Sequence, residues 1–197
     1  MDSKKLYSAL YALTANKGFR HPSLAGVLFD KGSIVASNAF AMVVAKTEYP
    51  PEWEGKILDK AGKEINEKPM YYKGVLPYDP DRALRTSDYG KISDLDELRE
   101  AMRMTPKSPD KDGERIGLEI EDSLFYVPLV QKVLSVFDVL GESIEVFVHT
   151  AGIGLQNRLI VLSENGGIGI VMPIIGIPDG PHPQKFTIEE ALCADLL

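Results

Sequence analysis

The apolar positions in the first 50 residues follow a helical period and then a strand period. Leu6, Leu10 and Leu13 fall on one face of a helix, because residues three and four apart are neighbours on a helix surface. We expect this helix to begin at Ser3 and to end at Gly18, where glycine can adopt a left-handed cap. Three short strands are expected to follow, over residues 24–29, 33–37 and 39–46, the first two joined by a tight turn at 30–32.

The chain repeats this order between residues 125 and 174. A second apolar helix is predicted with Pro128 in its first turn, where a missing N–H costs little, and with Gly141 at its end. Three more strands are predicted, over residues 144–149, 158–162 and 167–174. A helix followed by three strands therefore occurs twice, and the fold class is expected to be α+β with two similar halves.

Three further segments differ from this repeat. Residues 52–80 are rich in turns, with a small strand at 56–59, and the apolar residues 71, 72, 75 and 76 are expected to pack back on the core. Residues 79–115 resemble an insertion that contains a capped helix from about 93 to 104 and an exposed loop over 105–113. A strand over 115–121 then leads into the second helix, and a Pro- and Gly-rich tail ends in a short helix capped by Thr187.

Charge is distributed unevenly along the chain, whose formal net charge is -7. Residues 1–48 hold six Lys and Arg against three Asp and Glu, whereas both later stretches, 49–122 and 123–197, are acidic. The first helix and the turn after it are thus the one cationic region. Such asymmetry suits a protein with one face toward phosphate, and an equally simple explanation is a set of solvated surface lysines.

No motif for catalysis, metal binding or a cofactor is found in the sequence. The single Cys193 excludes a disulfide framework within the chain, and His21, His149 and His182 are far apart. We therefore expect no catalytic residue, no metal and no cofactor. No apolar run is long enough to cross a membrane and no signal peptide is recognised, so a cytoplasmic protein is expected.

Several short motifs, in the same order, resemble one domain of the bacterial DNA sliding clamp, the polymerase processivity ring. The match covers roughly residues 3–77 and 115–174, and the matching stretches are 20–27, 34–38, 68–77, 125–140 and 170–174. The resemblance implies a single clamp-like domain over 1–197. Its parts would be half one (1–78), an insertion (79–115), half two (116–175) and a C-terminal tail (176–197).

Helices of this family line the central hole, and their basic residues meet the DNA backbone without reading bases. Arg20 matches a DNA-contacting arginine of the family, and four lysines are further candidates by their position on the helices, namely Lys4, Lys5, Lys17 and Lys132. Five cations imply weak, salt-sensitive binding of duplex DNA. A ring would need six such domains, so one-domain subunits would form a hexamer or join other chains.

The family also has a groove that receives short peptides from polymerases and other partners, formed in part by a Met-Pro strand. Ile170, Met172 and Ile174 fall on the matching positions, although core packing explains a buried Met-Pro strand equally well. The resemblance thus implies a non-enzymatic clamp-fold protein of DNA replication or repair that tethers a polymerase-type partner. Two alternatives stay open: a scaffold that binds a peptide or protein without encircling DNA, and, less favoured, an enzyme on an unrelated α+β fold.

Overall fold

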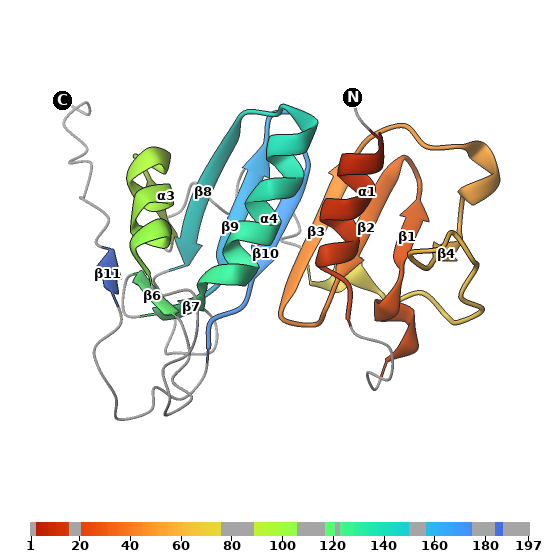
Figure 1. The fold of residues 1–197 in the computed structure, drawn as a ribbon, viewed down its shortest axis with the longest axis horizontal. Helices are drawn as coiled ribbons and strands as arrows, with labels where there is room; N and C mark the ends of the chain where they lie inside the picture. Colours follow the sequence, from red (N-terminus) through yellow and green to blue (C-terminus); the bar gives the residue numbers. More distant parts are fainter. Residues whose placement is uncertain are drawn as a thin grey trace.

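The computed structural model describes residues 3–15, 21–75, 89–105, 117–120, 123–149, 157–174 and 184–186. Helices lie on one face of a broad antiparallel sheet (Figure 1). The helices are α1 (Ser3–Ala12), α3 (Leu95–Met104) and α4 (Val127–Leu140), with short 3-10 turns η1 (Pro22–Ala25), η2 (Pro51–Trp53) and η3 (Tyr72–Gly74). The strands are β1 (Val27–Asp30), β2 (Ser33–Ser37), β3 (Ala41–Lys46), β4 (Ile57–Leu58), β5 (Tyr89–Ile92), β6 (Gly117–Ile120), β7 (Ser123–Tyr126), β8 (Ile144–His149), β9 (Leu159–Ser163), β10 (Ile168–Val171) and β11 (Gln184–Phe186).

The main sheet has the strand order β4-β1-β2-β3-β10-β9-β8-β5, and all neighbouring strands are antiparallel. The two predicted halves meet at its centre, where β3 pairs with β10 and Met42 lies opposite Ile170. Half one contributes a row of four strands, β4-β1-β2-β3, and half two contributes the next three, β10-β9-β8. The edge strand β5 comes from the stretch predicted as an insertion, so part of that stretch completes the sheet. A small second sheet has the order β11-β6-β7.

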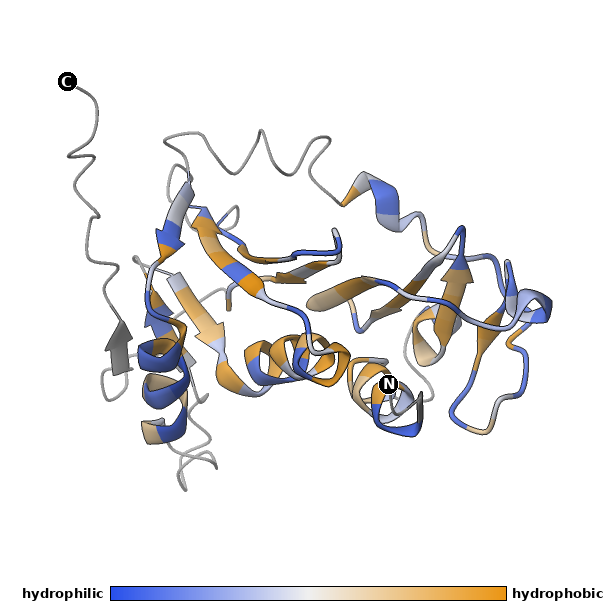
Figure 2. Cartoon of the chain, turned by 90° about the horizontal axis from the view of Figure 1, so that it is seen from above, coloured by the Kyte–Doolittle hydropathy of each residue, from blue (hydrophilic) through white to orange (hydrophobic). Residues whose placement is uncertain are grey.

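The helix side of the sheet holds the main core. The predicted stripe is fully buried there, with Leu6 and Leu10 on α1 and Leu13 directly after it, and α1 packs against α4. Pro128 lies in the first turn of α4 and Gly141 ends that helix with φ of 71°, as predicted. Figure 2, a view along the layers, shows α1 and α4 side by side on one side of the sheet, with α4 mostly hydrophobic.

The opposite side of the sheet, which we call the outer face, carries a second apolar cluster. Its buried members are Leu28, Val35, Met42, Val44, Ile57, Tyr72, Phe147, Ile160, Ile168 and Ile170. Half-buried Ile65, Met70 and Met172 pack against them. Strands with apolar residues on both faces, such as β2 and β10, need cover on both sides, and here helices provide one cover and loop segments contribute to the other.

Several predicted elements are confirmed. The strands over 33–37 and 144–149 have the predicted bounds, and the turn before the former has positive φ at Lys31 (50°) and Gly32 (73°), which suits a two-residue hairpin turn. The helix predicted to end at Met104 does so, and Asp94 caps it by accepting bonds from the N–H groups of Asp96 and Glu97.

Other predictions were wrong at their boundaries. The first helix ends at Ala12 and does not reach Gly18, because the N–H of Ala15 donates to Leu24 O at 2.8 Å and not to a carbonyl one turn earlier. Residues 22–25, predicted as strand from Leu24, form a 3-10 turn before β1. The hairpin strand β7 was not predicted. Gly18, the loop over 106–113 and the helix after Thr187 lie outside the described residues.

Candidate DNA-facing and partner-binding surfaces

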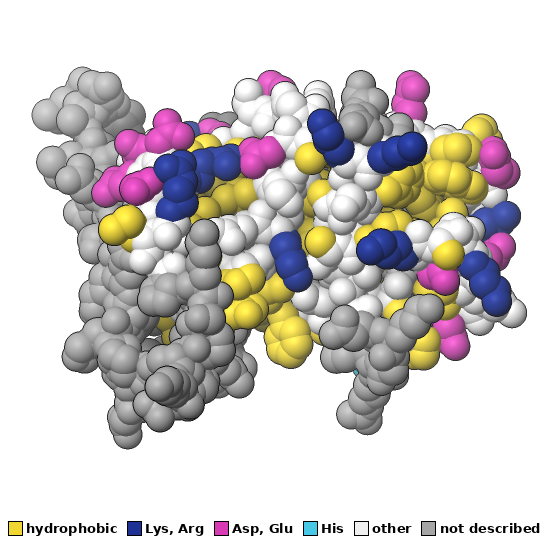
Figure 3. All heavy atoms as spheres, viewed as in Figure 1, with side chains coloured by type: hydrophobic (Ala, Val, Ile, Leu, Met, Phe, Trp, Pro, Cys, Tyr) yellow, Lys and Arg dark blue, Asp and Glu magenta, His cyan; other side chains and the backbone are white. Residues whose placement is uncertain are grey.

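The helix layer brings together three of the five predicted DNA-binding residues. Lys4 and Lys5 are exposed in the first turn of α1, and Lys132 is half-buried on the neighbouring α4. Figure 3 views this layer and shows basic side chains spread over α1 and α4. Arg20 and Lys17 lie outside the described residues, so their predicted role stays a prediction.

The potential across this layer is not uniform. Helix α1 carries no acidic residue, whereas α3 carries Asp96, Glu97 and Glu100. Asp138 near the end of α4 accepts two bonds from the Arg99 guanidinium of α3, at 2.7 and 3.1 Å, which tie α3 to α4. The hydrogen bond with this carboxylate is the main cause of the raised pKa of Arg99. The side chains of α1 sum to +2 and those of α3 to -1, since Arg99 and Arg103 offset two of its three acids, so a polyanion is favoured more at α1 than at α3.

The predicted peptide-pocket residues lie at the other side of the sheet, at the end of β10. Ile170 is only 2% exposed within the outer-face cluster, and half-buried Met172 packs against the same cluster. The N–H of Met172 donates to Phe40 O at 2.8 Å, and that of Ile174 donates to Leu124 O at 2.7 Å. Ile170 is thus core, while Met172 and Ile174 keep part of their surface exposed.

Sequence reasoning missed Phe40, which is 59% exposed at the turn between β2 and β3. Asn38 Oδ1 holds this turn by accepting from the N–H groups of Phe40 at 3.0 Å and Ala41 at 2.8 Å, and Ala39 has φ of 74°. An Asn side chain commonly forms a turn by accepting from the backbone N–H two residues on, so Asn38 between two strands was the available signal. The backbone bond to Met172 places Phe40 beside the end of β10.

A small hollow of about 20 Å³ opens on the outer face in half one. Its lining residues are Ser23, Leu24, Gly26, Leu28, Val35, Ser37, Ile57, Met70 and Tyr72. Five of them belong to or pack against the outer-face cluster, against which Met172 also packs, namely Leu28, Val35, Ile57, Met70 and Tyr72. Tyr72 is buried as predicted, but Tyr71 is 77% exposed and does not pack back on the core.

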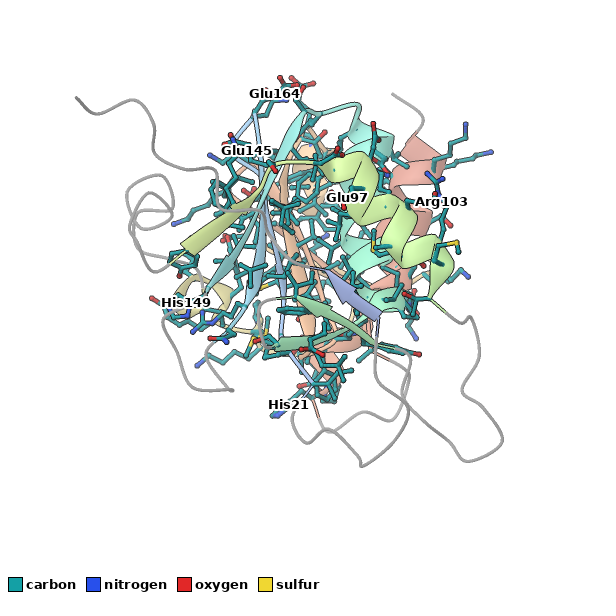
Figure 4. The ribbon with its side chains drawn as sticks, turned by 90° about the vertical axis from the view of Figure 1, so that its left-hand side faces the viewer. His21, Glu97, Arg103, Glu145, His149 and Glu164 are labelled. Atoms are coloured by element: carbon teal, nitrogen blue, oxygen red, sulfur yellow. The ribbon has the colours of Figure 1, made fainter. Side chains whose placement is uncertain are left out.

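The described residues contain no group of three or more His, Cys, Asp or Glu side chains that could hold a metal ion. Figure 4 shows His21 and His149 well apart, and His182 lies outside the described part. Among the helices that the structure describes, none is long and apolar enough to cross a membrane.

Comparison with known proteins gives no match to a protein-family model and none to a curated protein sequence. Solved structures do match. The DNA polymerase III beta subunit of Thermotoga maritima superposes with a TM-score of 0.56 and 16% identity, covering 88% of this chain and 64% of that one. The DNA polymerase sliding clamp of Bacillus subtilis superposes with a TM-score of 0.58 and 10% identity, covering 88% and 63%.

This chain therefore spans slightly less than two thirds of the length of either clamp chain. At 10–16% identity the likeness establishes the fold. The resemblance expected from the motifs is confirmed at that level, and the α+β architecture described above is the fold of the bacterial DNA polymerase sliding clamp.

Proposed function

We propose that this protein is a non-enzymatic clamp-fold protein that acts in DNA replication or repair. It binds the duplex backbone without reading sequence and tethers a polymerase-type partner. The observation that carries the proposal is the sliding-clamp fold combined with a cationic α1 in the helix layer, where Lys4 and Lys5 are exposed. Phosphate contacts of this kind give affinity and position but carry no base specificity.

Duplex DNA would lie against α1 and α4. Lys4, Lys5 and Lys132 would contact phosphates there, with Arg20 and Lys17 as further contacts. Release of condensed counterions by three to five such contacts predicts a slope of about -2.7 to -4.5 for log affinity against log salt. Fluorescence anisotropy with a labelled duplex between about 20 and 200 mM salt tests this. A slope near zero, or binding unaffected by Lys4→Glu with Lys5→Glu, would contradict the proposal.

The partner would dock on the outer face, opposite the DNA. Exposed Phe40, half-buried Met172 and the hollow beside Leu24 supply apolar surface on a rigid sheet, and methionine suits an adaptable contact. Ile174 is a further candidate, and Ile170 would support Met172 from the core. The test is primer extension by a bacterial replicative DNA polymerase with and without this protein. Longer products with the wild type, lost with Phe40→Asp, support the site.

The domain organisation proposed here is one clamp-like domain over residues 1–197, so encircling DNA requires several copies or other chains. Light scattering at several concentrations, with and without duplex, tests this. A closed oligomer, or one that assembles on DNA, supports a ring. A monomer that ignores DNA removes the encircling mechanism and leaves the partner site.

A second candidate is a clamp-fold scaffold that binds a peptide or protein without encircling DNA. The acidic α3 beside α4 favours it, because Asp96 and Glu97 share the helix layer with the lysines and oppose a polyanion there. Under this alternative, Lys4→Glu with Lys5→Glu leaves partner binding intact.

A further inference from the structure

The hollow on the outer face is closed on one side by a segment that is not part of the sheet. Residues 65–75, which we call the strap, follow β4. Ile65, Met70 and Tyr72 of this strap pack against the outer-face cluster. Met70 and Tyr72 also line the hollow, and Tyr72 is buried.

The hollow is too small for an apolar side chain of a partner. Its volume of about 20 Å³ is only slightly above what one water molecule needs. Its other walls include the apolar side chains of Leu28, Val35 and Ile57 together with Ser23 and Ser37. A partner side chain can therefore enter only if one wall moves.

The walls differ in how firmly they are held. Leu28, Val35 and Ile57 belong to β1, β2 and β4, whose backbones are paired within the sheet. The strap ends in the short turn η3, in which the Val75 N–H donates to Tyr72 O at 3.0 Å. At its start the strap is tied to β4, because the Ile65 N–H donates to Ile57 O at 2.8 Å, whereas the Tyr72 N–H donates within the strap, to Met70 O at 2.9 Å. A segment whose backbone bonds are local opens at lower free-energy cost than paired strands, so the part of the strap from Met70 to Val75 is the wall that moves.

Two side chains of the strap converge on one carboxylate. The Tyr72 hydroxyl donates to Asp30 Oδ2 at 2.7 Å, and Lys73 Nζ lies 3.2 Å from the same oxygen. The hydrogen bond from Tyr72, followed by Lys73, lowers the pKa of Asp30, so the carboxylate is charged at neutral pH. A separate bond, from Arg158 Nη1 to Val75 O at 3.1 Å, fastens the end of the strap to half two.

We propose that Asp30 latches the strap over the hollow, and that release of Tyr72 from Asp30 opens the hollow to an apolar side chain of a protein partner. This inference rests on the partner site proposed above and deepens it. Asp30 acts as a positioning residue, since it touches the strap and does not line the hollow.

Tyr72→Phe tests the latch, because it removes the hydroxyl and keeps the ring that fills the core. Tyr49→Phe is the matched control. It removes a hydroxyl that donates to Glu54 Oε2 at 2.6 Å and accepts from the Gly32 N–H at 3.0 Å, at the turn that follows Asp30, and it breaks no hydrogen bond between Asp30 and the strap. Amide hydrogen exchange of Tyr72 and Val75, and fluorescence of added 8-anilinonaphthalene-1-sulfonate, are measured without any partner.

The expected result is about tenfold faster exchange at Tyr72 and Val75 and brighter dye fluorescence in Tyr72→Phe, with β1 and β2 amides unchanged. The control should leave the strap as in the wild type. Equal exchange in both variants, or faster exchange throughout the sheet, would overturn the latch. Lys73→Ala, a change at an exposed side chain, gives a milder second measurement if Tyr72→Phe folds poorly. An opened strap that still binds no partner would overturn the partner site and leave the latch standing.

Discussion

The two halves of the molecule place one helix each on the same face of the sheet but hold it by different packing. In half one, α1 lies over large rings: Phe29 contacts Trp53 with ring centroids 5.1 Å apart, and Tyr7 of α1 contacts Trp53 at 5.6 Å. In half two, α4 lies directly on β10, where a Cβ added to Gly169 would meet Val133 Cγ1 at 2.4 Å. In half one, aromatic side chains fill the space between helix and sheet. In half two, a glycine in the strand lets the helix lie directly on the sheet.

This difference predicts opposite sensitivities. In half one, the free energy of unfolding should fall most when a buried side chain becomes smaller, because a cavity then forms under α1. In half two, the free energy of unfolding should fall most when a buried side chain becomes larger, because α4 has no room to move away from the sheet.

The largest effect is expected from Phe29→Ala. Phe29 is fully buried beneath α1, and its truncation should lower the free energy of unfolding by about 3–5 kcal/mol. Denaturant titration followed by fluorescence of Trp53, the single tryptophan, measures this. The control Phe40→Ala, at a 59% exposed ring, should change stability by less than about 0.5 kcal/mol. Similar losses in both variants would refute the cavity explanation.

Gly169→Ala should lower stability by about 1–3 kcal/mol, because the added methyl group forces α4 off β10. The same titration, followed also by circular dichroism, gives the value. Gly74→Ala is the control, since the atoms nearest to its added methyl belong to the exposed Tyr71 ring, which can turn away. A neutral Gly169→Ala would show that the contact between α4 and β10 is looser than described.

A smaller effect concerns the exposed surfaces of the two helices. Lys4→Glu with Lys5→Glu should weaken duplex binding about tenfold at low salt, because two phosphate contacts become repulsive. Lys132→Glu on α4 should weaken it about threefold. Anisotropy titrations compare the two variants. Equal losses would mean that the halves share the DNA-facing role evenly.

The smallest expected effect is a loss of stability at alkaline pH that comes from a tyrosine in half one. The Tyr11 hydroxyl of α1 donates to Leu58 O at 2.8 Å and also contacts Asp59 O, and burial followed by the Asp59 charge raises the pKa of Tyr11 to about 12. The folded protein therefore favours the neutral form of the Tyr11 hydroxyl. The stability it contributes is therefore complete below pH of about 10 and lost as pH rises toward 12.

Tyr11→Phe should cost about 1 kcal/mol at pH 7 and reduce the alkaline loss. Tyr11 lies in half one, so the part of the alkaline loss that Tyr11→Phe removes belongs to that half. Melting temperatures at pH 8, 10 and 11 check it. Tyr72, whose pKa is also raised, mainly by burial, accounts for part of the remaining slope. An alkaline loss unchanged by Tyr11→Phe would be the contrary result.

Much of the fold followed from local sequence, because local chemistry fixes those elements. Pro128 and Gly141 bound α4 through backbone preferences, and the turn at Lys31-Gly32 joins the first hairpin by its positive φ angles. Features set by distant contacts were missed. The bond from Ala15 to Leu24 ends α1 early, and pairing with β8 turns residues 89–92 into a strand.

The candidate sites also combine features that local sequence predicts with features that depend on distant contacts. Exposure of Lys4 and Lys5 followed from the helical period, since both lie off the leucine stripe. The hollow did not, because its walls come from η1, three strands and the strap, which only the folded chain brings together. The predicted set at 170, 172 and 174 assumed continuous alternation, but β10 ends at Val171 and the chain then bonds to Phe40 and Leu124.

The central pairing of β3 with β10 also has a consequence for synthesis of the chain. Met42 leaves the ribosome long before its partner Ile170, so half one is made with the apolar strand Ala41–Lys46 as an uncovered edge. An apolar edge of this kind is a template for pairing with other chains, and contacts of high sequence separation form slowly. Overproduction at lower temperature or with chaperones should therefore raise the yield of soluble protein.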